Sequence, residues 1–462
     1  MPLEESTRTV AGLMDWLRDP DMRKWLLPGM GVKRWLLLFI IGMAVLGLGV
    51  SYLAREAYVV WTLPDIFYEI TLQFLPRWVR ATIFITASVG LTGFAIWKVN
   101  AAMLAAVRQR HRGNGGDERL VNLVYRHRFS TRGPRVVTIG GGTGMSVLLR
   151  GLKDYTTNLT AVVTVADDGG SSGRLRRDLG VIPPGDVRNC IAALADAEPL
   201  MTRLFQYRFP EESGESLTGH SFGNLFIVAL SEITGSMEEA IHETSRVLAV
   251  RGQILPSTME DVQLVARTTE GRTIRGESRI AQAGVEIHDI QLEPAAPRAY
   301  PAAANAIRNA DMIVLGPGSL YSSILPNLLV PELRIAFHES TAMKVYVCNV
   351  ATQPGETPHY SVQDHVNAIE QHVGGTICDF VIANDNLVDQ LPEPWHSEPV
   401  RMAESGGEGS ESARVISADV VDIHNRYRHD SDKLASVILN LYHEQGEAAP
   451  RRADVDSVLA SI

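Results

Sequence analysis

The chain has 462 residues, a formal net charge of −10 and three cysteines, and this length predicts two or three structural units. Residues 1–130 carry 16 Lys and Arg against 10 Asp and Glu, whereas residues 131–462 carry 27 against 43, so the acidic larger part argues against a nucleic-acid partner. Cys190, Cys348 and Cys378 share no metal or redox spacing, which predicts buried thiols in a reducing compartment.

Two long apolar segments lie near the N-terminus. Residues 35–54 provide 20 residues without a charge, enough to cross about 30 Å of hydrocarbon, and residues 81–97 provide 17 more. Lys and Arg are denser before the first segment and after the second than between them, which places both ends in the cytoplasm. We therefore expect a membrane anchor over residues 1–110, formed by a transmembrane helical hairpin. A signal peptide fits poorly, because the apolar run starts late and a second one follows.

After a polar linker at 111–134, an α/β domain is expected over residues 135–445, followed by a tail at 446–462. The alternation of strands and helices predicts a Rossmann-like, mostly parallel sheet. Strands are expected at 136–139, 159–165, 312–315, 344–349, 379–382 and 414–417. Helices are expected at 145–153, 187–197, 200–206, 221–233, 237–249, 301–309, 332–340, 362–372 and 431–443. A small β-rich insertion is expected over 262–292 with a turn at Glu270-Gly271, and residues 403–413 are low-complexity.

A glycine-rich loop follows the first strand of this domain and consists of Gly140, Gly141, Gly142, Thr143 and Gly144. Glycines let backbone N–H groups approach an anion, and the next helix points its positive end at the same place. The loop is not a dinucleotide fingerprint, because Met145 stands where the third glycine belongs, and no P-loop lysine follows. A tight turn alone would not need four glycines in five positions, so we expect the loop to bind phosphate.

The second strand ends in Asp167 and Asp168, the two candidate catalytic residues. One acid there could hold a ribose hydroxyl, or acids beside a phosphate loop could hold Mg²⁺, with Asp168 as the expected metal ligand. Only one of the two is expected to touch ligand. A flexible basic loop follows, in which ligand contacts are expected from Gly169, Gly170, Ser171, Ser172 and Arg174. Arginine pairs bidentately with phosphate, and Arg174 is preferred over Arg176 and Arg177.

Further candidates lie at later loops. Asp186 stands where a helix cap belongs, and capping explains it as well as catalysis does. Arg188, Asn189 and Asn224 could reach the ligand, whereas His220 is more often structural. At the second glycine loop, we expect Gly316, Gly318 and Ser319 to contact a second phosphate. Tyr321 either offers a ring face to the ligand or is a core residue. Thr352 begins a polar segment near the crevice and is a further expected ligand contact. Without a nucleophile triad or His-rich spacing, any chemistry would be metal-assisted phosphoryl or nucleotidyl transfer.

Together these loops resemble the YvcK/CofD-like family over most of residues 135–442. The matching segments are 140–144, 167–174, 183–189, 219–224, 315–321, 326–330 and 345–357, and the last three look like the YvcK (gluconeogenesis factor, GlmR) branch. The resemblance implies a cytoplasmic domain that binds UDP-N-acetylglucosamine or another nucleotide, and that regulates carbon flow into cell-wall precursors and cell shape. The other branch implies a Mg²⁺-dependent 2-phospho-L-lactate transferase, which moves a phospholactyl-type group from a guanosine diphosphate carrier onto a deazaflavin precursor.

A regulatory protein that binds a nucleotide sugar is therefore the favoured interpretation. The alternative is a Mg²⁺-dependent phospholactyl or nucleotidyl transferase, so whether the chain is an enzyme stays open. An NAD-dependent enzyme is a third interpretation, weakened by Met145. The hairpin departs from the soluble members typical of the family and implies a multi-pass protein of a bacterial inner membrane, with the functional domain in the cytoplasm. Expected partners are the lipid bilayer, enzymes of cell-wall precursor synthesis and a second copy of the chain.

Overall fold

The computed structural model describes residues 133–196, 199–214, 216–387, 396–402 and 413–448, and parts of the stretch from 47 to 90. The chain divides into two units, Met1–Arg128 and Phe129–Ile462. In the first unit, residues 77–88 are helical. Most of the first expected transmembrane segment (35–54), part of the second (81–97) and most of the linker (111–134) lie outside the described residues. Most of the low-complexity stretch (403–413) lies outside them as well. Among the residues that are described, none of the helices combines the length and the apolar character needed to cross a membrane.

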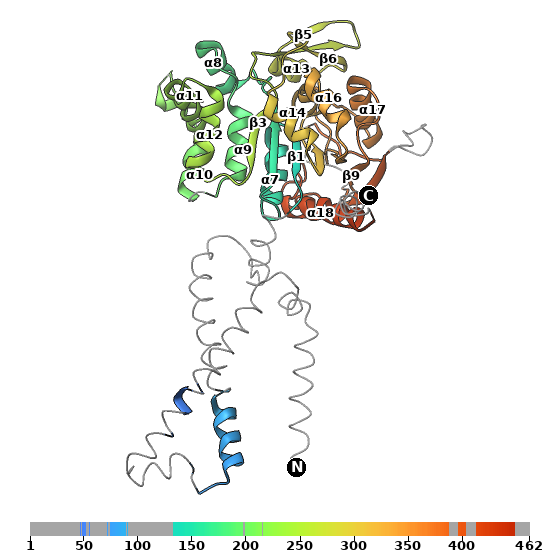
Figure 1. The fold of residues 1–462 in the computed structure, drawn as a ribbon. Helices are drawn as coiled ribbons and strands as arrows, with labels where there is room; N and C mark the ends of the chain where they lie inside the picture. Colours follow the sequence, from blue (N-terminus) through green and yellow to red (C-terminus); the bar gives the residue numbers. More distant parts are fainter. Residues whose placement is uncertain are drawn as a thin grey trace, which may run out of the picture. The chain divides into compact units, whose positions relative to one another are not determined.

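The second unit is built on a parallel sheet that is seven-stranded in its described part (Figure 1). Its spatial order is β10 (Arg414–Ala418), β9 (Phe380–Asn384), β8 (Met343–Val347), β7 (Met312–Leu315), β1 (Val136–Gly140), β2 (Leu159–Val163) and β3 (Gln253–Pro256). Every neighbouring pair is parallel. All residues of β1 and β7 are buried, as expected for strands covered on both faces. The α/β fold and its mostly parallel sheet are confirmed, and β3 is an addition to the strands expected.

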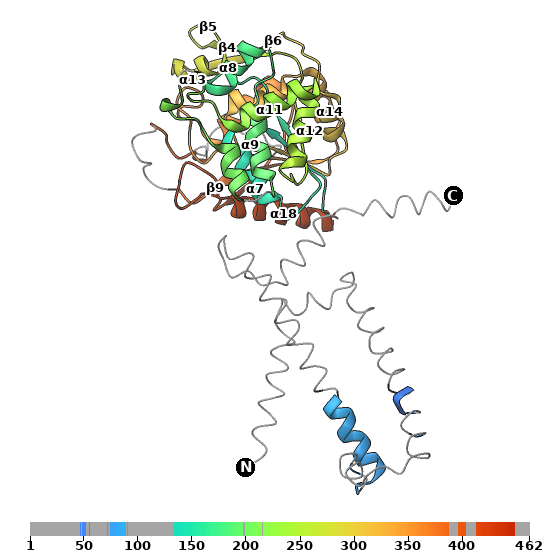
Figure 2. The same cartoon turned by 90° about the vertical axis from the view of Figure 1, so that its left-hand side faces the viewer.

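Helices connect these strands and cover the sheet (Figure 2). In chain order they are α7 (Gly142–Leu152), α8 (Gly170–Leu179), α9 (Gly185–Leu194), α10 (Pro199–Gln206), α11 (Phe222–Thr234), α12 (Met237–Val247), α14 (Pro301–Arg308), α15 (Leu325–Leu328), α16 (Pro331–Glu339), α17 (Val362–Val373) and α18 (Ser431–Ala448). A π-helical turn, η2 (Leu320–Ile324), precedes α15. The helix α7 packs against both α9 and α18, which ties the first helix of the unit to its last.

The insertion between β3 and β7 is a small antiparallel sheet in the order β5, β4, β6. Its elements are β4 (Gln263–Thr268), β5 (Thr273–Arg275), α13 (Glu277–Ala283) and β6 (Ile287–Glu293). The expected turn at Glu270-Gly271 joins β4 to β5, and Gly271 has a φ of 80°, a conformation that favours glycine. The β-rich insertion is thus confirmed, with one helix inside it.

One expectation about the fold is wrong. The segment after Asp168 was expected to be a flexible loop, but it forms the helix α8 from Gly170 to Leu179. Gly173 serves close packing in this helix, because a Cβ there would lie 1.8 Å from the backbone oxygen of Asp168. A glycine that allows such an approach looks the same in sequence as a glycine that allows motion.

Candidate functional site

The two glycine loops meet at the topological switch point of the sheet. Strand β1 lies between β2 and β7, so the chain leaves β1 toward one edge of the sheet and leaves β7 toward the other. In open α/β sheets, such a point opens a crevice at the carboxyl ends of the strands. The N–H of Gly316 donates to the Ile139 oxygen at 3.0 Å, which brings the end of β7 beside the end of β1.

A cavity of about 450 Å³ occupies this crevice. From the first glycine loop it is lined by Gly141, Gly142, Thr143 and Gly144; from the second by Pro317, Gly318, Ser319 and Ser323; from the segment after β8 by residues 349–354; and from the C-terminal part by Ser397, Asn425, Tyr427, Arg428 and His429. Seven of the predicted ligand residues therefore share one hollow: Gly141, Gly142, Thr143, Gly144, Gly318, Ser319 and Thr352.

Close backbone approach explains the glycines at this cavity. A Cβ on Gly144 would lie 2.6 Å from the Pro317 oxygen, and one on Gly141 would lie 2.5 Å from Oδ2 of Asp186. Gly142 has a φ of 66°, which L-residues rarely adopt. The helix α7 begins at Gly142, so its positive end faces the hollow, and the Gly142 N–H itself donates to Asp186. This is the arrangement that binds phosphate in other α/β folds.

The cavity also contains a cation that sequence reasoning missed. Arg428 is the one Lys or Arg side chain among its described lining residues. A tight loop places it, in which the Asp422 N–H donates to the Arg428 oxygen and the Arg428 N–H donates to the Asn425 oxygen, both at 2.9 Å. His429 is buried and donates from Nε2 to the Cys348 oxygen at 3.1 Å; burial lowers its pKa to about 4, so this imidazole stays neutral. The polar run 425–429 before the last helix was the available signal.

Beside the cavity lies a carboxylate cluster, formed by Asp167, Asp186 and Glu277. Burial, and then the charge of Asp167, raise the pKa of Asp186 to about 7, although the Gly142 N–H opposes this by donating to the carboxylate. Burial, and then the charge of Asp167, raise the pKa of Glu277 to about 8. Burial raises the pKa of Asp167 as well. These carboxylates are candidate ligands for a divalent cation, because Mg²⁺ prefers carboxylates plus ligand phosphates.

The structure gives Asp186 and Asp168 partners that the sequence did not identify. Asp186 makes no side-chain cap to its own helix α9 and instead accepts from the first N–H of α7, so the capping explanation holds for a different helix. Asp168 accepts from the Ser278 N–H at 2.9 Å and so anchors α13. Its role as a metal ligand stays a prediction, and Asp167 lies nearer the centre of the cluster.

The remaining predicted residues lie in a polar group outside the cavity or in the core. Oγ of Ser171 lies 3.1 Å from Nδ2 of Asn224, and Arg188 donates to Oδ1 of Asn189 at 2.7 Å. Arg174 donates to the Thr218 oxygen at 2.6 Å.

Tyr321 is 2% exposed, and its hydroxyl pairs with that of Tyr360 at 2.9 Å, so the core alternative describes it. Gly140 ends β1, and Gly169, Gly170 and Ser172 lie at the start of α8. Gly316, with a φ of 74°, forms the turn after β7.

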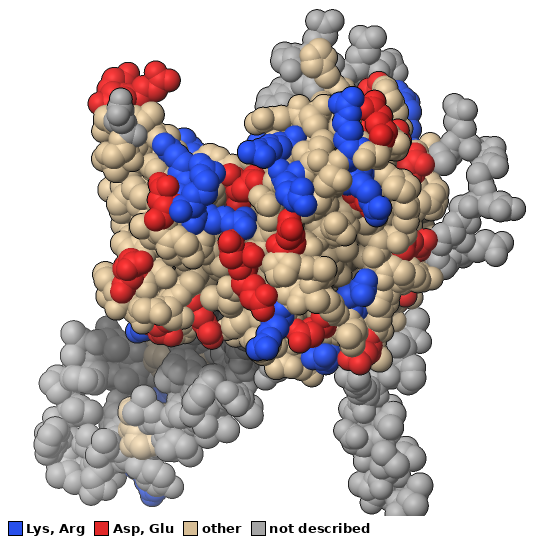
Figure 3. Space-filling view, turned by 90° about the horizontal axis from the view of Figure 1, so that it is seen from above, with Lys and Arg blue, Asp and Glu red and all other residues tan. Residues whose placement is uncertain are grey.

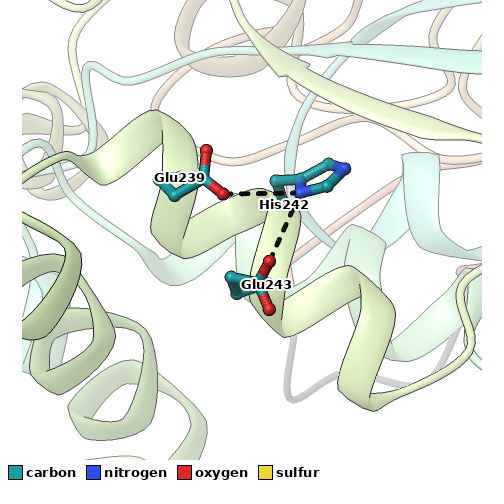
Figure 4. A group of neighbouring side chains, drawn as sticks. All are labelled: Glu239, His242 and Glu243. Carbon is teal, nitrogen blue, oxygen red and sulfur yellow. Dashed lines mark ion pairs between the residues drawn. The ribbon is translucent and has the colours of Figure 1, made fainter.

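A separate group with metal-ligand spacing lies on α12 (Figure 4). His242 Nδ1 lies 3.8 Å from Glu239 and 3.7 Å from Glu243. All three side chains retain substantial exposure, and Glu243 pairs with Arg246 at 2.6 Å. Ordinary surface ion pairing accounts for this group, and none of it lines the cavity.

Comparison with known proteins gives consistent matches. Residues 136–421 match a family described as 2-phospho-L-lactate transferase CofD. The gluconeogenesis factor of Bacillus subtilis is 46% identical over 315 residues, which cover 67% of this chain and 99% of that protein. A Nostoc relative, also named as a gluconeogenesis factor, is 44% identical over 430 residues, covering 91% and 92%. A crystal structure of a Bacillus halodurans protein is similar with a TM-score of 0.63 at 44% identity, covering 66% of this chain and 99% of that one.

These alignments differ in their coverage of the N-terminal region. The Bacillus subtilis alignment is short enough to fit within the α/β unit, whereas the Nostoc alignment is longer than the part of the chain from residue 133 onward. A sequence before the α/β unit is therefore shared with some relatives and absent from others.

Proposed function

The chain belongs to the CofD-like family together with the gluconeogenesis factors, and we propose that it binds a nucleoside diphosphate sugar of the UDP-N-acetylglucosamine type in the cavity between β1 and β7. The observation that carries this proposal is the meeting of both glycine loops in one hollow of about 450 Å³. A volume of this order suits a small-molecule ligand. Two loops of backbone N–H groups suit the two phosphates of a diphosphate.

Side chains around the cavity support the same ligand. Arg428 supplies a positive charge for a phosphate. Nε2 of Gln353 donates to Oγ of Ser319 at 2.8 Å, and Nδ2 of Asn349 donates to the Gly318 oxygen at 3.0 Å. These bonds hold the second loop against the segment after β8, so the phosphate-binding surface is fixed before a ligand arrives. Asn425 and Tyr427 offer polar and aromatic groups for a base or a sugar.

From this binding site follows a regulatory role. In this proposal, the fraction of chains with bound nucleotide sugar rises and falls with the supply of cell-wall precursors. The chain, as a homodimer, then regulates carbon flow and cell shape by contacting the enzymes that make those precursors. The N-terminal apolar segments would hold it at the inner membrane, with the α/β unit in the cytoplasm.

The carboxylate cluster favours a second candidate, a Mg²⁺-dependent phospholactyl or nucleotidyl transferase. Asp167 and Asp186 lie beside the expected phosphates, and burial followed by the charge of Asp167 raises the pKa of both Asp186 and Glu277. Mg²⁺ held there would neutralise charge on a transferring phosphoryl group. The chain's own residues would orient the phosphates through the glycine loops, and Glu277, whose pKa is raised to about 8, would be a proton donor near neutral pH.

Calorimetry with the full chain in detergent tests the first candidate. UDP-N-acetylglucosamine should bind saturably, and Arg428→Gln should weaken binding about tenfold or more, because a charge-assisted hydrogen bond contributes roughly 1.5–3 kcal/mol. Arg401→Gln is the matched control, since Arg401 is exposed and does not line the cavity. If no UDP-, GDP- or NAD-type compound binds, the proposal fails. Turnover that requires Mg²⁺ and is lost in Asp167→Asn would favour the transferase instead.

A further inference from the structure

Three arginines lie together beyond the carboxylate cluster and have neutral oxygens as their hydrogen-bond partners. Arg174 of α8 donates to the Thr218 oxygen at 2.6 Å, and Arg208, just after α10, donates to the Gly219 oxygen at 2.8 Å. Arg188 of α9 donates to Oγ of Ser221 at 2.7 Å. Within the described residues, none of the three forms an ion pair with a carboxylate. Arg176, also on α8, differs because it pairs with Asp261.

Arg188 is the most buried arginine of the three. Arg188 is 9% exposed, and its Nε has no hydrogen-bond partner in the part of the chain that the structure describes. Burial, followed by the charge of Arg208, lowers its pKa, while Asp186 and Asp167 offset this only in part. A buried guanidinium whose charge is only partly compensated is costly, and binding of an anion reduces that cost.

Polar groups complete a site around these arginines. Oγ of Ser171 lies 3.0 Å from Nδ1 of His220 and 3.1 Å from Nδ2 of Asn224, and it accepts from the Ser221 N–H at 3.3 Å. Asn224 is 2% exposed, and its Nδ2 is the donor that it places at the first turn of α8. We call Arg174, Arg188, Arg208, Ser171 and Asn224 the arginine cluster.

Helix ends add to the positive potential of the arginine cluster. The helices α8, α9 and α11 all begin here, at Gly170, Gly185 and Phe222, and they lie side by side in both ribbon views (Figures 1 and 2). Each helix has eight or more residues, so each brings a positive end to the site. On the face seen from above, Lys and Arg side chains gather close to acidic ones (Figure 3).

The arginine cluster is distinct from the nucleotide cavity but adjoins the carboxylates. None of its residues lines that cavity. The contact with the carboxylates runs through the first turn of α8, where Ser172 hydrogen-bonds to Asp167 and lies 3.5 Å from Nδ2 of Asn224. Along the crevice the order is therefore nucleotide cavity, carboxylate cluster, arginine cluster.

We propose that the arginine cluster binds the phosphate group of a second ligand, a phosphate monoester held at the same time as the nucleotide, with the carboxylate cluster between the two. Three guanidinium groups and three helix ends match the double charge of a phosphate monoester better than the single charge of a carboxylate. The inference rests on the proposed function for the position of the nucleotide.

Inorganic phosphate is the probe, titrated into the full chain in detergent and phosphate-free buffer, with and without saturating UDP. Phosphate should bind saturably in both conditions. Arg208→Gln should weaken phosphate binding about tenfold, since it removes one charged donor, and should leave UDP affinity within twofold. Asn224→Asp keeps the size of the side chain but adds a negative charge, so it should abolish phosphate binding. Arg177→Gln, an exposed change on α8, is the control and should alter neither affinity.

Each contrary result has a clear meaning. Absence of saturable phosphate binding overturns the inference, and so does competitive displacement of phosphate by UDP, because the arginines would then serve the nucleotide's own phosphates. If UDP does not bind but phosphate binding still weakens in Arg208→Gln, the nucleotide proposal falls and the phosphate site stands. A phosphate affinity unchanged in both Arg208→Gln and Asn224→Asp would place the phosphate elsewhere.

Discussion

The carboxylate cluster should make the α/β unit less stable as the pH rises. The pKa values of Asp186 and Glu277 are raised to about 7 and about 8, above the values of about 4 expected in the unfolded chain. Between these limits the folded state holds more protons than the unfolded state, so the free energy of unfolding falls from about pH 4 to about pH 8. The effect is fully developed above the folded pKa values and absent below the unfolded ones.

The magnitude can be worked out for Asp186. A shift from 3.8 to about 7 corresponds to about 4 kcal/mol at 1.36 kcal/mol for each pH unit. Asp186 keeps part of its accessible surface toward the crevice, and its titration is coupled to that of Asp167 and Glu277, so we expect about half, roughly 2 kcal/mol. Asp186→Asn cannot ionise and can still accept from the Gly142 N–H. It should therefore stabilise the chain at pH 8 and have little effect at pH 5.

Thermal unfolding of the full chain at pH 5 and pH 8, with and without Mg²⁺, is the assay. Mg²⁺ should raise the melting temperature of the unmodified chain at pH 8, where the carboxylates are ionised, and much less at pH 5 or in Asp186→Asn. Asp432→Asn, an exposed change on α18, is the matched control and should show neither effect. An Asp186→Asn chain that is less stable than the original at pH 8 would refute the reasoning, because the carboxylate would then be stabilising.

Three further predictions concern close contacts. A Cβ on Gly151 would lie 2.1 Å from the Ser431 oxygen, so Gly151→Ala should force α7 away from α18 and lower the free energy of unfolding in urea by about 1–3 kcal/mol; an unchanged midpoint would contradict this packing. Gly144→Ala would place its Cβ 2.6 Å from the Pro317 oxygen, so calorimetry should show UDP-N-acetylglucosamine affinity reduced about tenfold, and undiminished affinity would argue against the shared cradle. Nδ2 of Asn327 donates to the last carbonyl of β1 at 3.1 Å, so Asn327→Ala should cost roughly 1–3 kcal/mol in chemical unfolding, whereas an equal loss in Asn327→Gln would point to shape alone.

The sequence was sufficient to predict the switch point and the loops that form it. Buried β-branched runs ending in glycine mark strands of a parallel sheet, and their alternation with helices sets the topology. The convergence of the loops at Gly140 and Gly316 follows from this topology, because neighbouring parallel strands end at the same edge. The shared cavity confirms that prediction.

What the sequence could not show depends on contacts between distant segments. Gly173 looked like a sign of flexibility, yet it lets α8 pack on the Asp168 oxygen. Asp186 looked like the cap of its own helix, yet its partner is Gly142 of α7. Arg428 enters the cavity from a loop just before the last helix, and no local pattern links that loop to the first strand. In each case the partner is fixed by tertiary packing rather than by spacing along the chain.

The position of the carboxylate cluster also bears on the choice between a binding protein and an enzyme. A protein that only binds a nucleotide sugar has no need of ionisable acids beside the diphosphate, because ionised carboxylates repel it. The fold instead surrounds Asp186 with protein atoms and sets Asp167 and Glu277 against it, so that burial and repulsion raise the pKa values of all three. Such an arrangement is unfavourable for the protein alone and becomes favourable once a cation is shared with phosphate oxygens. If the proposed Mg²⁺ binds here, the cluster would serve the cation and the phosphates together, whether the proposed nucleotide is sensed or consumed.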